Sequence, residues 1–320
     1  MPLFAQDQKF AEIKNLRLEK VGEIASCRVG YRTFGTLNAA KSNGIVFPTW
    51  FGGKSADLAG SIGPGKLADS SRFFVIGVDA LGDGVSCSPT NSSAAFPDIA
   101  IADMVESQYR LVTEHLGLRH LYAVMGISMG GMQTFQWMVA HPDFMDLAVP
   151  IVGSPRSTTT DLLLWESELR IIENAERCHC DLQQAMHAVE TVHTLALYTP
   201  EWHATHEPAD KLAALSQSID AQADRGMRAL DWAAQLKAIM TLDVGRPFSS
   251  GLAAAALAVK AKTLVVVSAQ DHMVNPLPAE TFARQIHAQT LVVNSDCGHM
   301  ATGCAAAEID ARVRAFLEAE

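Results

Sequence analysis

The sequence lacks the features that mark nucleic-acid-binding and disordered proteins. It has no excess of basic residues, because 35 Asp and Glu residues outnumber 25 Lys and Arg residues and give a formal net charge of −10. An acidic chain is repelled by nucleic acids and by anionic membrane surfaces, so we expect neither as a partner. Charged residues make up only 19% of the chain and hydrophobic residues 48%, which is typical of a globular protein.

Long apolar runs are also lacking. The most apolar window, residues 252–268, is interrupted by Lys260 and Lys262 and is too short to span a bilayer. Residues 1–20 mix charged and apolar side chains and lack the apolar core of a signal peptide. The six cysteines are irregularly spaced, so we expect reduced thiols rather than disulfides. These features together predict a cytoplasmic protein.

What the sequence does contain is an alternation of strand-like and helix-like segments in two blocks. The first block has strand patterns at residues 26–34, 44–49, 73–79, 121–126 and 146–152, with a helix pattern at 101–116. The second block has strand patterns at 263–267 and 290–293 and helix patterns at 276–286 and 305–317. Continuously apolar strands such as 121–125 indicate a parallel sheet that is buried on both faces.

A helical stretch separates the two blocks. Residues 154–243 contain no convincing strand, and helix-forming composition fills 162–175, 181–197 and 210–240. We therefore predict an α/β fold whose core comprises residues 1–153 and 244–320. Residues 154–243 are predicted to be an inserted helical lid over the edge of the sheet where ligands bind.

The most informative motif is Gly126-Ile127-Ser128-Met129-Gly130, which follows a strand pattern and opens a helix pattern. This is the context of the G-x-S-x-G nucleophile elbow, in which a strained turn lifts the serine hydroxyl clear of the sheet. The flanking glycines let backbone segments approach closely. Ser128 is therefore our candidate nucleophile.

A serine nucleophile needs a base and an acid that orients the base. Asp271 follows the predicted strand 263–267, and His299 follows the predicted strand 290–293, so both lie at the same sheet edge as Ser128. The order Ser, Asp, His is that of α/β-hydrolases. His272 is a rival base, but it is adjacent to the proposed acid and is poorly placed to bond to it.

Two backbone N–H groups are candidates for an oxyanion hole. The N–H of Met129 lies at the predicted helix start, directly after the nucleophile. The second donor should come from the loop after an early strand, and there we favour Trp50, with its neighbour Phe51 as the alternative. We expect no cofactor and no metal, because the run Cys178-His179-Cys180 has no second ligand pair at zinc spacing.

Several segments resemble the homoserine O-acetyltransferase family. They are Gly65-Lys66-Leu67, Arg72 through Gly77, Gly126 through Trp137 and Thr241 through Arg246. The resemblance covers about residues 15–318. It implies an α/β-hydrolase fold with a mostly parallel central sheet and a helical lid, a triad of Ser128, Asp271 and His299, an acyl-serine intermediate, and homodimers formed through lid helices.

The chain departs from that family at the positions that bind homoserine. Family members typically have an aspartate after the catalytic histidine, which helps to bind the homoserine amino group, and here the residue is Met300. The lid motif Asp-Pro-x-Trp-x-x-Gly-x-Tyr is absent, and the comparable region is residues 169–180. The loop 81–91 is more similar to the serine-rich loop of hydrolase-type relatives.

We therefore favour a serine hydrolase that cleaves small acyl esters of the acetyl type. The alternative is an O-acyltransferase that moves an acetyl group from acetyl-CoA, as co-substrate, to a hydroxyl acceptor. Both reactions use the same triad, so the sequence leaves both open. A third reading, a non-enzymatic binding module, is disfavoured because Ser128, Asp271 and His299 are all present.

Overall fold

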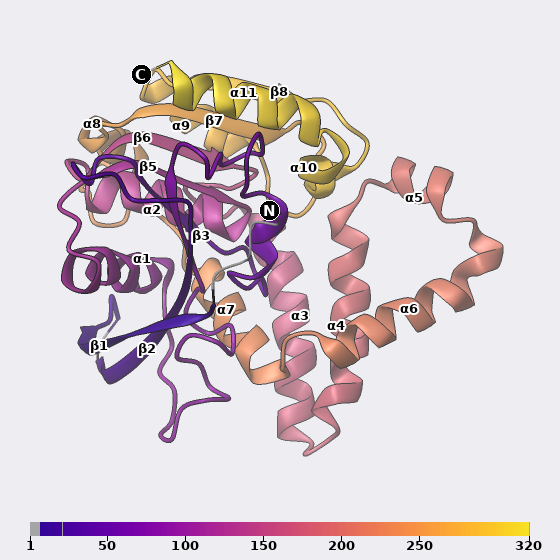
Figure 1. Ribbon diagram of the computed structural model, residues 1–320. Helices are drawn as coiled ribbons and strands as arrows, with labels where there is room; N and C mark the ends of the chain where they lie inside the picture. Colours follow the sequence, from indigo (N-terminus) through magenta and orange to yellow (C-terminus); the bar gives the residue numbers. More distant parts are fainter. Residues whose placement is uncertain (1–6, 21, 320) are drawn as a thin grey trace.

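The computed structural model describes residues 7–20 and 22–319, and within them it forms one eight-stranded sheet (Figure 1). The strands are β1 (Lys9–Arg17), β2 (Glu23–Phe34), β3 (Gly44–Pro48), β4 (Phe74–Val78), β5 (Leu121–Ile127), β6 (Met145–Ile151), β7 (Lys262–Ser268) and β8 (Gln289–Val293). Their order is β1-β2-β4-β3-β5-β6-β7-β8. β1 and β2 pair antiparallel, β2 and β4 pair antiparallel, and each remaining pair is parallel.

Helices connect the strands and cover the sheet. They are α1 (Ile101–Arg110), α2 (Met129–Ala140), α3 (Thr159–Arg177), α4 (Leu182–Leu197), α5 (Pro200–His206), α6 (Leu212–Arg225), α7 (Ala229–Met240), α8 (Leu252–Ala258), α9 (Leu277–Gln285), α10 (Ala301–Cys304) and α11 (Ala306–Glu318). The remaining described elements are three short 3-10 helices and one π-helical segment. The 3-10 helices are η1 (Asp57–Gly60), η3 (Ala209–Lys211) and η4 (Gly298–Met300), and the π-helical segment is η2 (Leu111–His115).

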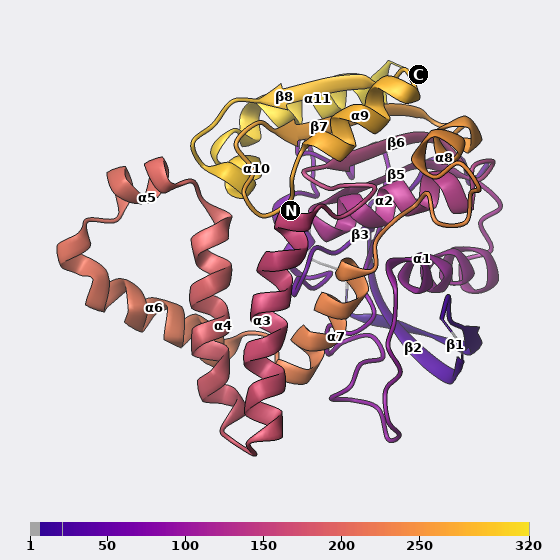
Figure 2. The ribbon, with the colours of Figure 1, turned by 180° about the vertical axis from the view of Figure 1, so that it is seen from behind.

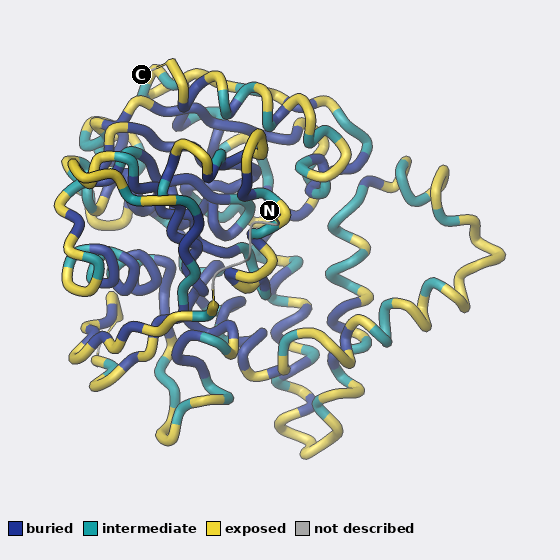
Figure 3. Tube along the Cα trace, in the orientation of Figure 1, coloured by how far each residue is buried: buried dark blue, intermediate teal, exposed yellow. Residues whose placement is uncertain are grey.

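Alternating side chains of the central strands build one apolar core on each face of the sheet. On β7, Val265 and Val267 belong to one buried cluster, and Leu264 and Val266 belong to the other. This alternation follows from the two-residue period of a strand. The first cluster includes side chains of α1, α2 and α9, and the second includes those of η1 and α11. Figure 3 shows the buried residues gathered at the centre of the sheet, whereas the edge strands β1 and β8 are largely exposed.

The lid helices α3 to α7 are inserted between β6 and β7. α3 packs against α4 and α7, and α4 packs against α6. Figures 1 and 2 show α5 and α6 as an arm that extends away from the sheet. We keep 154–243 as the proposed limits of the lid, because Arg156 and Asp243 pair at its base, with Nε and Oδ2 3.0 Å apart.

The α/β prediction is confirmed, and the differences are local. β1 was not predicted. Its exposed and buried residues alternate only in part, so its sequence lacks a clear strand pattern. The strand is defined by its pairing with β2. The predicted helix 210–240 is interrupted at Gly226, where the backbone is extended between α6 and α7. Glycine has a low helix propensity, and this break turns α7 back toward α3.

Within the described ranges, no helix is long and apolar enough to cross a membrane. The expected absence of a signal peptide concerns residues 1–20, and residues 1–6 lie outside the described part of the chain.

The expectation of reduced cysteines is wrong. Three disulfides join Cys27 to Cys87, Cys178 to Cys180 and Cys297 to Cys304. Sequence spacing did not reveal them because two of the pairs are brought together only by chain folding, Cys27 and Cys87 across 60 residues. Cys178 and Cys180 are therefore not thiolate metal ligands, and the cysteines give no support for a reducing compartment.

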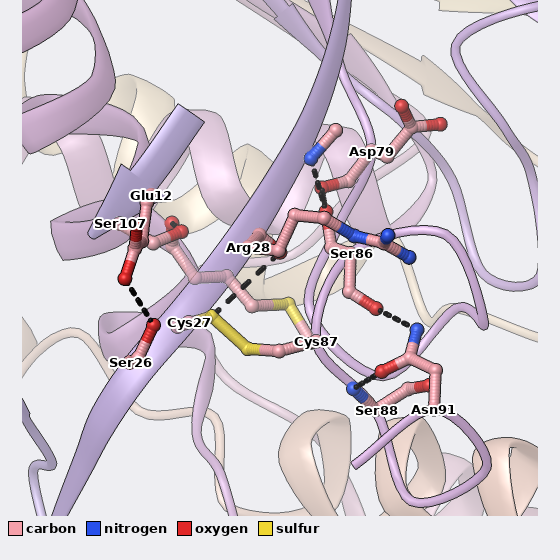
Figure 4. The surroundings of a disulfide bond; sticks show 12 residues. Glu12, Ser26, Cys27, Arg28, Asp79, Ser86, Cys87, Ser88, Asn91 and Ser107 are labelled. Carbon is pink, nitrogen blue, oxygen red and sulfur yellow. Dashed lines mark hydrogen bonds between the residues drawn. A yellow bond between two sulfur atoms is a disulfide. The ribbon is translucent and has the colours of Figure 1, made fainter. Parts of the chain in front are cut away.

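The disulfide between Cys27 and Cys87 anchors the loop that follows β4 to strand β2 (Figure 4). The same loop is closed by Asn91, whose side chain accepts from the Ser88 N–H at 3.0 Å and donates to the Ser86 carbonyl at 2.8 Å. Both cysteines are buried. The disulfide thus restricts a long segment whose unfolded form would otherwise have high entropy.

We expect replacement of both Cys27 and Cys87 by Ala to lower the free energy of unfolding by roughly 4 kcal/mol, because the closed loop is long. Urea unfolding without reductant measures this change. The control is the double replacement of Cys178 and Cys180, which closes a loop of sequence separation 2 and should matter far less. Six reactive thiols in the unfolded, unreduced wild-type protein would contradict the pairing.

Candidate active site

Ser128 lies in a strained turn between β5 and α2. Its backbone has φ 57° and ψ −120°, which a non-glycine residue rarely adopts, and its N–H donates to the Ile151 carbonyl at 2.8 Å. Strain of this kind persists only where the surroundings enforce it, and it is concentrated at functional sites. The turn directs the chain from the end of a buried strand straight into a helix.

Close backbone contacts enforce this turn. A Cβ on Gly126 would lie 2.3 Å from the Gly130 carbonyl oxygen, and a Cβ on Gly130 would lie 2.5 Å from the Pro48 carbonyl oxygen. No side chain fits at either position, so only glycine lets α2 start this close to β5 and β3. The glycines of the motif thus have a packing role that fixes the place of Ser128.

The structure brings Ser128, Asp271 and His299 together. His299 Nε2 lies 2.8 Å from Ser128 Oγ, and His299 Nδ1 lies 2.6 Å from Asp271 Oδ2. The side chains of His299 and Asp271 are only 6% and 1% exposed. β5, β6, β7 and β8 lie side by side in this order and run parallel. The loops that follow β5, β7 and β8 therefore meet at one edge of the sheet.

The second oxygen of Asp271 is also engaged. Oδ1 accepts hydrogen bonds from the N–H groups of Met273 at 2.9 Å and Val274 at 2.8 Å. An ionised carboxylate only accepts, so the proton of the contact with His299 is on Nδ1. The lone pair of Nε2 therefore faces the Ser128 hydroxyl, which is the arrangement a general base needs. His272, the rival base, is exposed and takes no part in these contacts.

Two further bonds hold the loop that carries His299. Ser268 Oγ, at the end of β7, donates to the Gly298 carbonyl at 2.7 Å. Thr199 Oγ1, between α4 and α5, donates to the Asp296 carbonyl at 2.6 Å. The first bond joins this loop to the sheet and the second joins it to the lid, so the lid is attached directly to the histidine loop.

The loop after β3 has its backbone orientation fixed by glutamine side chains. Gln133 Nε2 donates to the Thr49 carbonyl at 3.0 Å, and Gln235 Oε1 accepts from the Gly52 N–H at 2.9 Å. In a trans peptide the Thr49 carbonyl and the Trp50 N–H point in opposite directions, so Gln133 also orients that N–H. The described hydrogen bonds use neither the Trp50 nor the Phe51 N–H, so the choice between them stays a prediction.

A cavity of about 560 Å³ opens beside the serine and histidine. Its lining comes from the β3 loop, the elbow, α4, α7 and the histidine loop, and includes Trp50, Ser128, Glu190, Trp232 and Met300. A second, apolar recess of about 10 Å³ shares Phe51, His193 and Met273 with the larger cavity and also borders Ser128. Met129, Met132, Trp165, Leu236, Ile239 and Val274 are among the residues that line it.

The lid places a buried group of charged residues at the cavity. Glu168 is fully buried and accepts hydrogen bonds from Trp232 Nε1 at 3.0 Å and His193 Nδ1 at 3.1 Å. Burial alone would lower the pKa of His193, but the charge and hydrogen bond of Glu168 outweigh it and the pKa is raised. Burial raises the pKa of Glu190, with His193 opposing and Glu168 adding to the rise.

Sequence reasoning missed Glu168, Glu190 and His193. Glu190 and His193 are three residues apart and therefore share one face of α4, next to the buried Val189. That spacing was a readable signal. Nothing in the sequence, however, indicated that this face covers Ser128, because the lid contacts the sheet edge only in the folded chain.

Comparison with known proteins shows the family to which this fold belongs. Residues 45–302 match the model of the alpha/beta hydrolase fold family. The chain belongs to the alpha/beta hydrolase fold family. This confirms the predicted fold class. The resemblance to homoserine O-acetyltransferases is also confirmed. A homoserine O-acetyltransferase of Pelobacter propionicus is 36% identical over 178 residues, which cover 47% of this chain and 46% of that protein.

One esterase is similar in sequence over a longer stretch. The ethyl acetate hydrolase of Pseudomonas veronii is 31% identical over 277 residues, which cover 80% of this chain and 78% of that protein. The crystal structure of an acetylester hydrolase from Corynebacterium glutamicum superposes with a TM-score of 0.91 at 26% identity, covering 98% of this chain and 96% of that one. The chain spans about half the length of other curated relatives that it matches, including the transferase above.

We expect Glu168→Gln to lower the raised pKa of His193, although the charge of Glu190 still raises it in the variant. The substitution removes the negative charge that raises this pKa and leaves the burial that lowers it. Titration of the histidine ring protons by NMR measures the change. Glu176→Gln, an exposed position on the same helix, is the matched control. An unchanged His193 titration in Glu168→Gln would contradict the role of this pair.

Proposed function

We propose that this chain is a serine hydrolase that cleaves acetyl-type esters of small alcohols through a covalent acyl-serine. The observation that carries the proposal is the continuous hydrogen-bonded series from Ser128 through His299 to Asp271 at the mouth of a cavity. The similarity to an ethyl acetate hydrolase and an acetylester hydrolase supports the same reaction.

In the proposed mechanism, Ser128 Oγ attacks the ester carbonyl carbon while His299 Nε2 takes the hydroxyl proton. Asp271 stabilises the resulting imidazolium and keeps the ring in the required tautomer. The tetrahedral intermediate collapses, and His299 returns the proton to the alcohol as the carbon–oxygen bond breaks. Water then attacks the acyl-serine with His299 as base, which releases the acid and restores Ser128.

The negative oxygen of the tetrahedral intermediate needs donors that are already in place. We propose the N–H of Met129, at the N-terminus of α2, and that of Trp50, with Phe51 as the alternative. The first N–H groups of a helix have no partner within it, and the helix dipole favours negative charge at this end. Removal of one such donor typically lowers the rate by about 10²–10³.

The small recess supports a short acyl group. Its volume of about 10 Å³ is near that required for a single water molecule, and its lining is mostly apolar. An acetyl methyl group is of comparable size, whereas a longer acyl chain would have to displace side chains such as Leu236, which is fully buried. The alcohol portion then occupies the larger cavity.

The alternative, transfer of an acetyl group from acetyl-CoA to a hydroxyl acceptor, uses the same triad and is supported by the similarity to homoserine O-acetyltransferases. The larger cavity disfavours an amino-acid acceptor. Its described lining includes the carboxylates of Asp57 and Glu190 and contains neither lysine nor arginine to pair with an acceptor carboxylate. Met300, at the position of the family's aspartate, cannot pair with an ammonium group.

The partner of the reaction is thus a small-molecule ester, and no cofactor is required. We keep a homodimer through lid helices as a further proposal. Leu163 on α3, Leu195 on α4 and Leu212 on α6 are 66%, 69% and 63% exposed, and exposed apolar side chains on one subdomain are typical of association surfaces.

We expect wild-type protein to hydrolyse 4-nitrophenyl acetate without an acceptor and to release no thiol from acetyl-CoA, with or without homoserine or serine. Ser128→Ala should lower kcat on the order of 10⁶-fold, because the nucleophile is lost. Paired absorbance assays measure nitrophenol and free thiol. Acceptor-dependent thiol release would instead establish the transferase, and full activity in Ser128→Ala would refute the mechanism.

We also expect a strong preference for acetate over hexanoate esters, which Leu236→Ala should relax by about tenfold in the ratio of kcat/KM values because it enlarges the recess. The matched control is Leu264→Ala. It removes an equally buried leucine on β7, away from the recess, and should leave the ratio unchanged. Equal kcat/KM values for both acyl lengths in the wild type would disprove a limiting recess.

A further inference from the structure

Glu190 is a carboxylate of the larger cavity that the proposed mechanism does not use. It is on α4, is only 4% exposed, and lines the same cavity as Ser128 and His299. A buried carboxylate is normally paired with a cation or accepts several hydrogen bonds. No donor among the described residues hydrogen-bonds or ion-pairs with Glu190.

The neighbours of Glu190 explain why it has no partner. His193 is its nearest opposite charge, but His193 Nδ1 is committed to Glu168, 3.1 Å away. Each oxygen of Glu168 in turn accepts one hydrogen bond, from His193 and from Trp232. On its other side Glu190 faces Gly226, where an added Cβ would lie 3.5 Å from Glu190 Oε1, so that side offers no side-chain donor either.

The position of Glu190 is therefore suited to a donor that arrives with the substrate. The acyl group occupies the small recess in our proposal, so the alcohol portion extends into the cavity that Glu190 lines. A group on that alcohol that donates a hydrogen bond replaces the water that Glu190 would otherwise need. Hydrogen bonds to a buried charge are among the strongest in proteins, and an unmade one is costly.

We propose that Glu190 is a specificity-determining residue that binds a hydrogen-bond donor on the alcohol portion of the ester. The substrate class is a short-chain ester of a polyol or of an amino alcohol, in which a hydroxyl or an ammonium group lies a few atoms from the ester oxygen. The apolar wall formed by Trp50, Met227 and Trp232 contacts the carbon chain between the two groups. This inference rests on the proposed ester hydrolysis.

The test compares kcat/KM within two pairs of acetate esters that have nearly the same shape. Butyl acetate is matched with 3-hydroxypropyl acetate, which carries a hydroxyl donor. 3-Methylbutyl acetate is matched with 2-(dimethylamino)ethyl acetate, which carries an ammonium donor when protonated. The donor changes the intrinsic reactivity of the ester equally in every variant, so the change in the ratio between the wild type and a Glu190 variant isolates the contribution of Glu190.

Two variants separate the sources of the effect. Glu190→Leu removes the acceptor and should lower the ratio in the favoured pair by about tenfold or more, as expected for a bond to a charged group. Glu190→Gln keeps an acceptor without the charge. It should lower the ammonium ratio strongly and the hydroxyl ratio only slightly, so it distinguishes the two donors. Glu190→Ala, which also removes the acceptor, carries the test if Glu190→Leu does not fold.

Glu176→Gln is the control, and it should leave both ratios at their wild-type values. If both ratios stay within twofold of the wild type in Glu190→Leu or Glu190→Ala, which remove the acceptor, the proposal is overturned. Failure of the wild type to hydrolyse 4-nitrophenyl acetate or any of the four esters would instead refute the proposed function. The two failures are therefore distinguishable.

Discussion

The site depends on the close contact between three backbone segments at the carboxyl edge of the sheet. α2 begins so near β5 and β3 that Gly126 and Gly130 have no room for a side chain. This contact forces Ser128 into its strained turn, directly before the first residue of α2. The other residues of the site are arranged around the hydroxyl group of Ser128, whose position this contact fixes.

The parallel sheet supplies the second requirement, which is convergence. Asp271 and His299 are far from Ser128 in the sequence, yet both follow strands that end at the same edge. Bonds outside the triad hold these loops in place, from Ser268 to the histidine loop and from Thr199 of the lid to the same loop. The lid is therefore part of the support of the site as well as its cover.

The lid also sets the chemical character of the space around the serine. Leu236 and Trp165 help to line a narrow apolar recess, while Glu190 and His193 bring charge to the larger cavity. A small apolar recess beside a larger cavity that contains a carboxylate suits the proposed ester, which has a short acyl group and a polar alcohol. The buried Glu168 maintains this division because it fixes His193 and Trp232.

The sequence by itself determined the α/β architecture and its helical insertion, because the periodicity of strands and helices is a local signal. It also identified Ser128, Asp271 and His299 as candidates, because the glycine-flanked elbow and the order of the strands can be recognised in the sequence. The tertiary structure alone decided the pairing of Cys27 with Cys87, since these residues are 60 positions apart in the sequence, and the place of β1, which is defined by its backbone pairing with β2. It also decided which lid residues meet the serine. In the sequence, α4 has the pattern of an ordinary amphipathic helix. Only the packing of the folded chain places its Glu190 at the cavity.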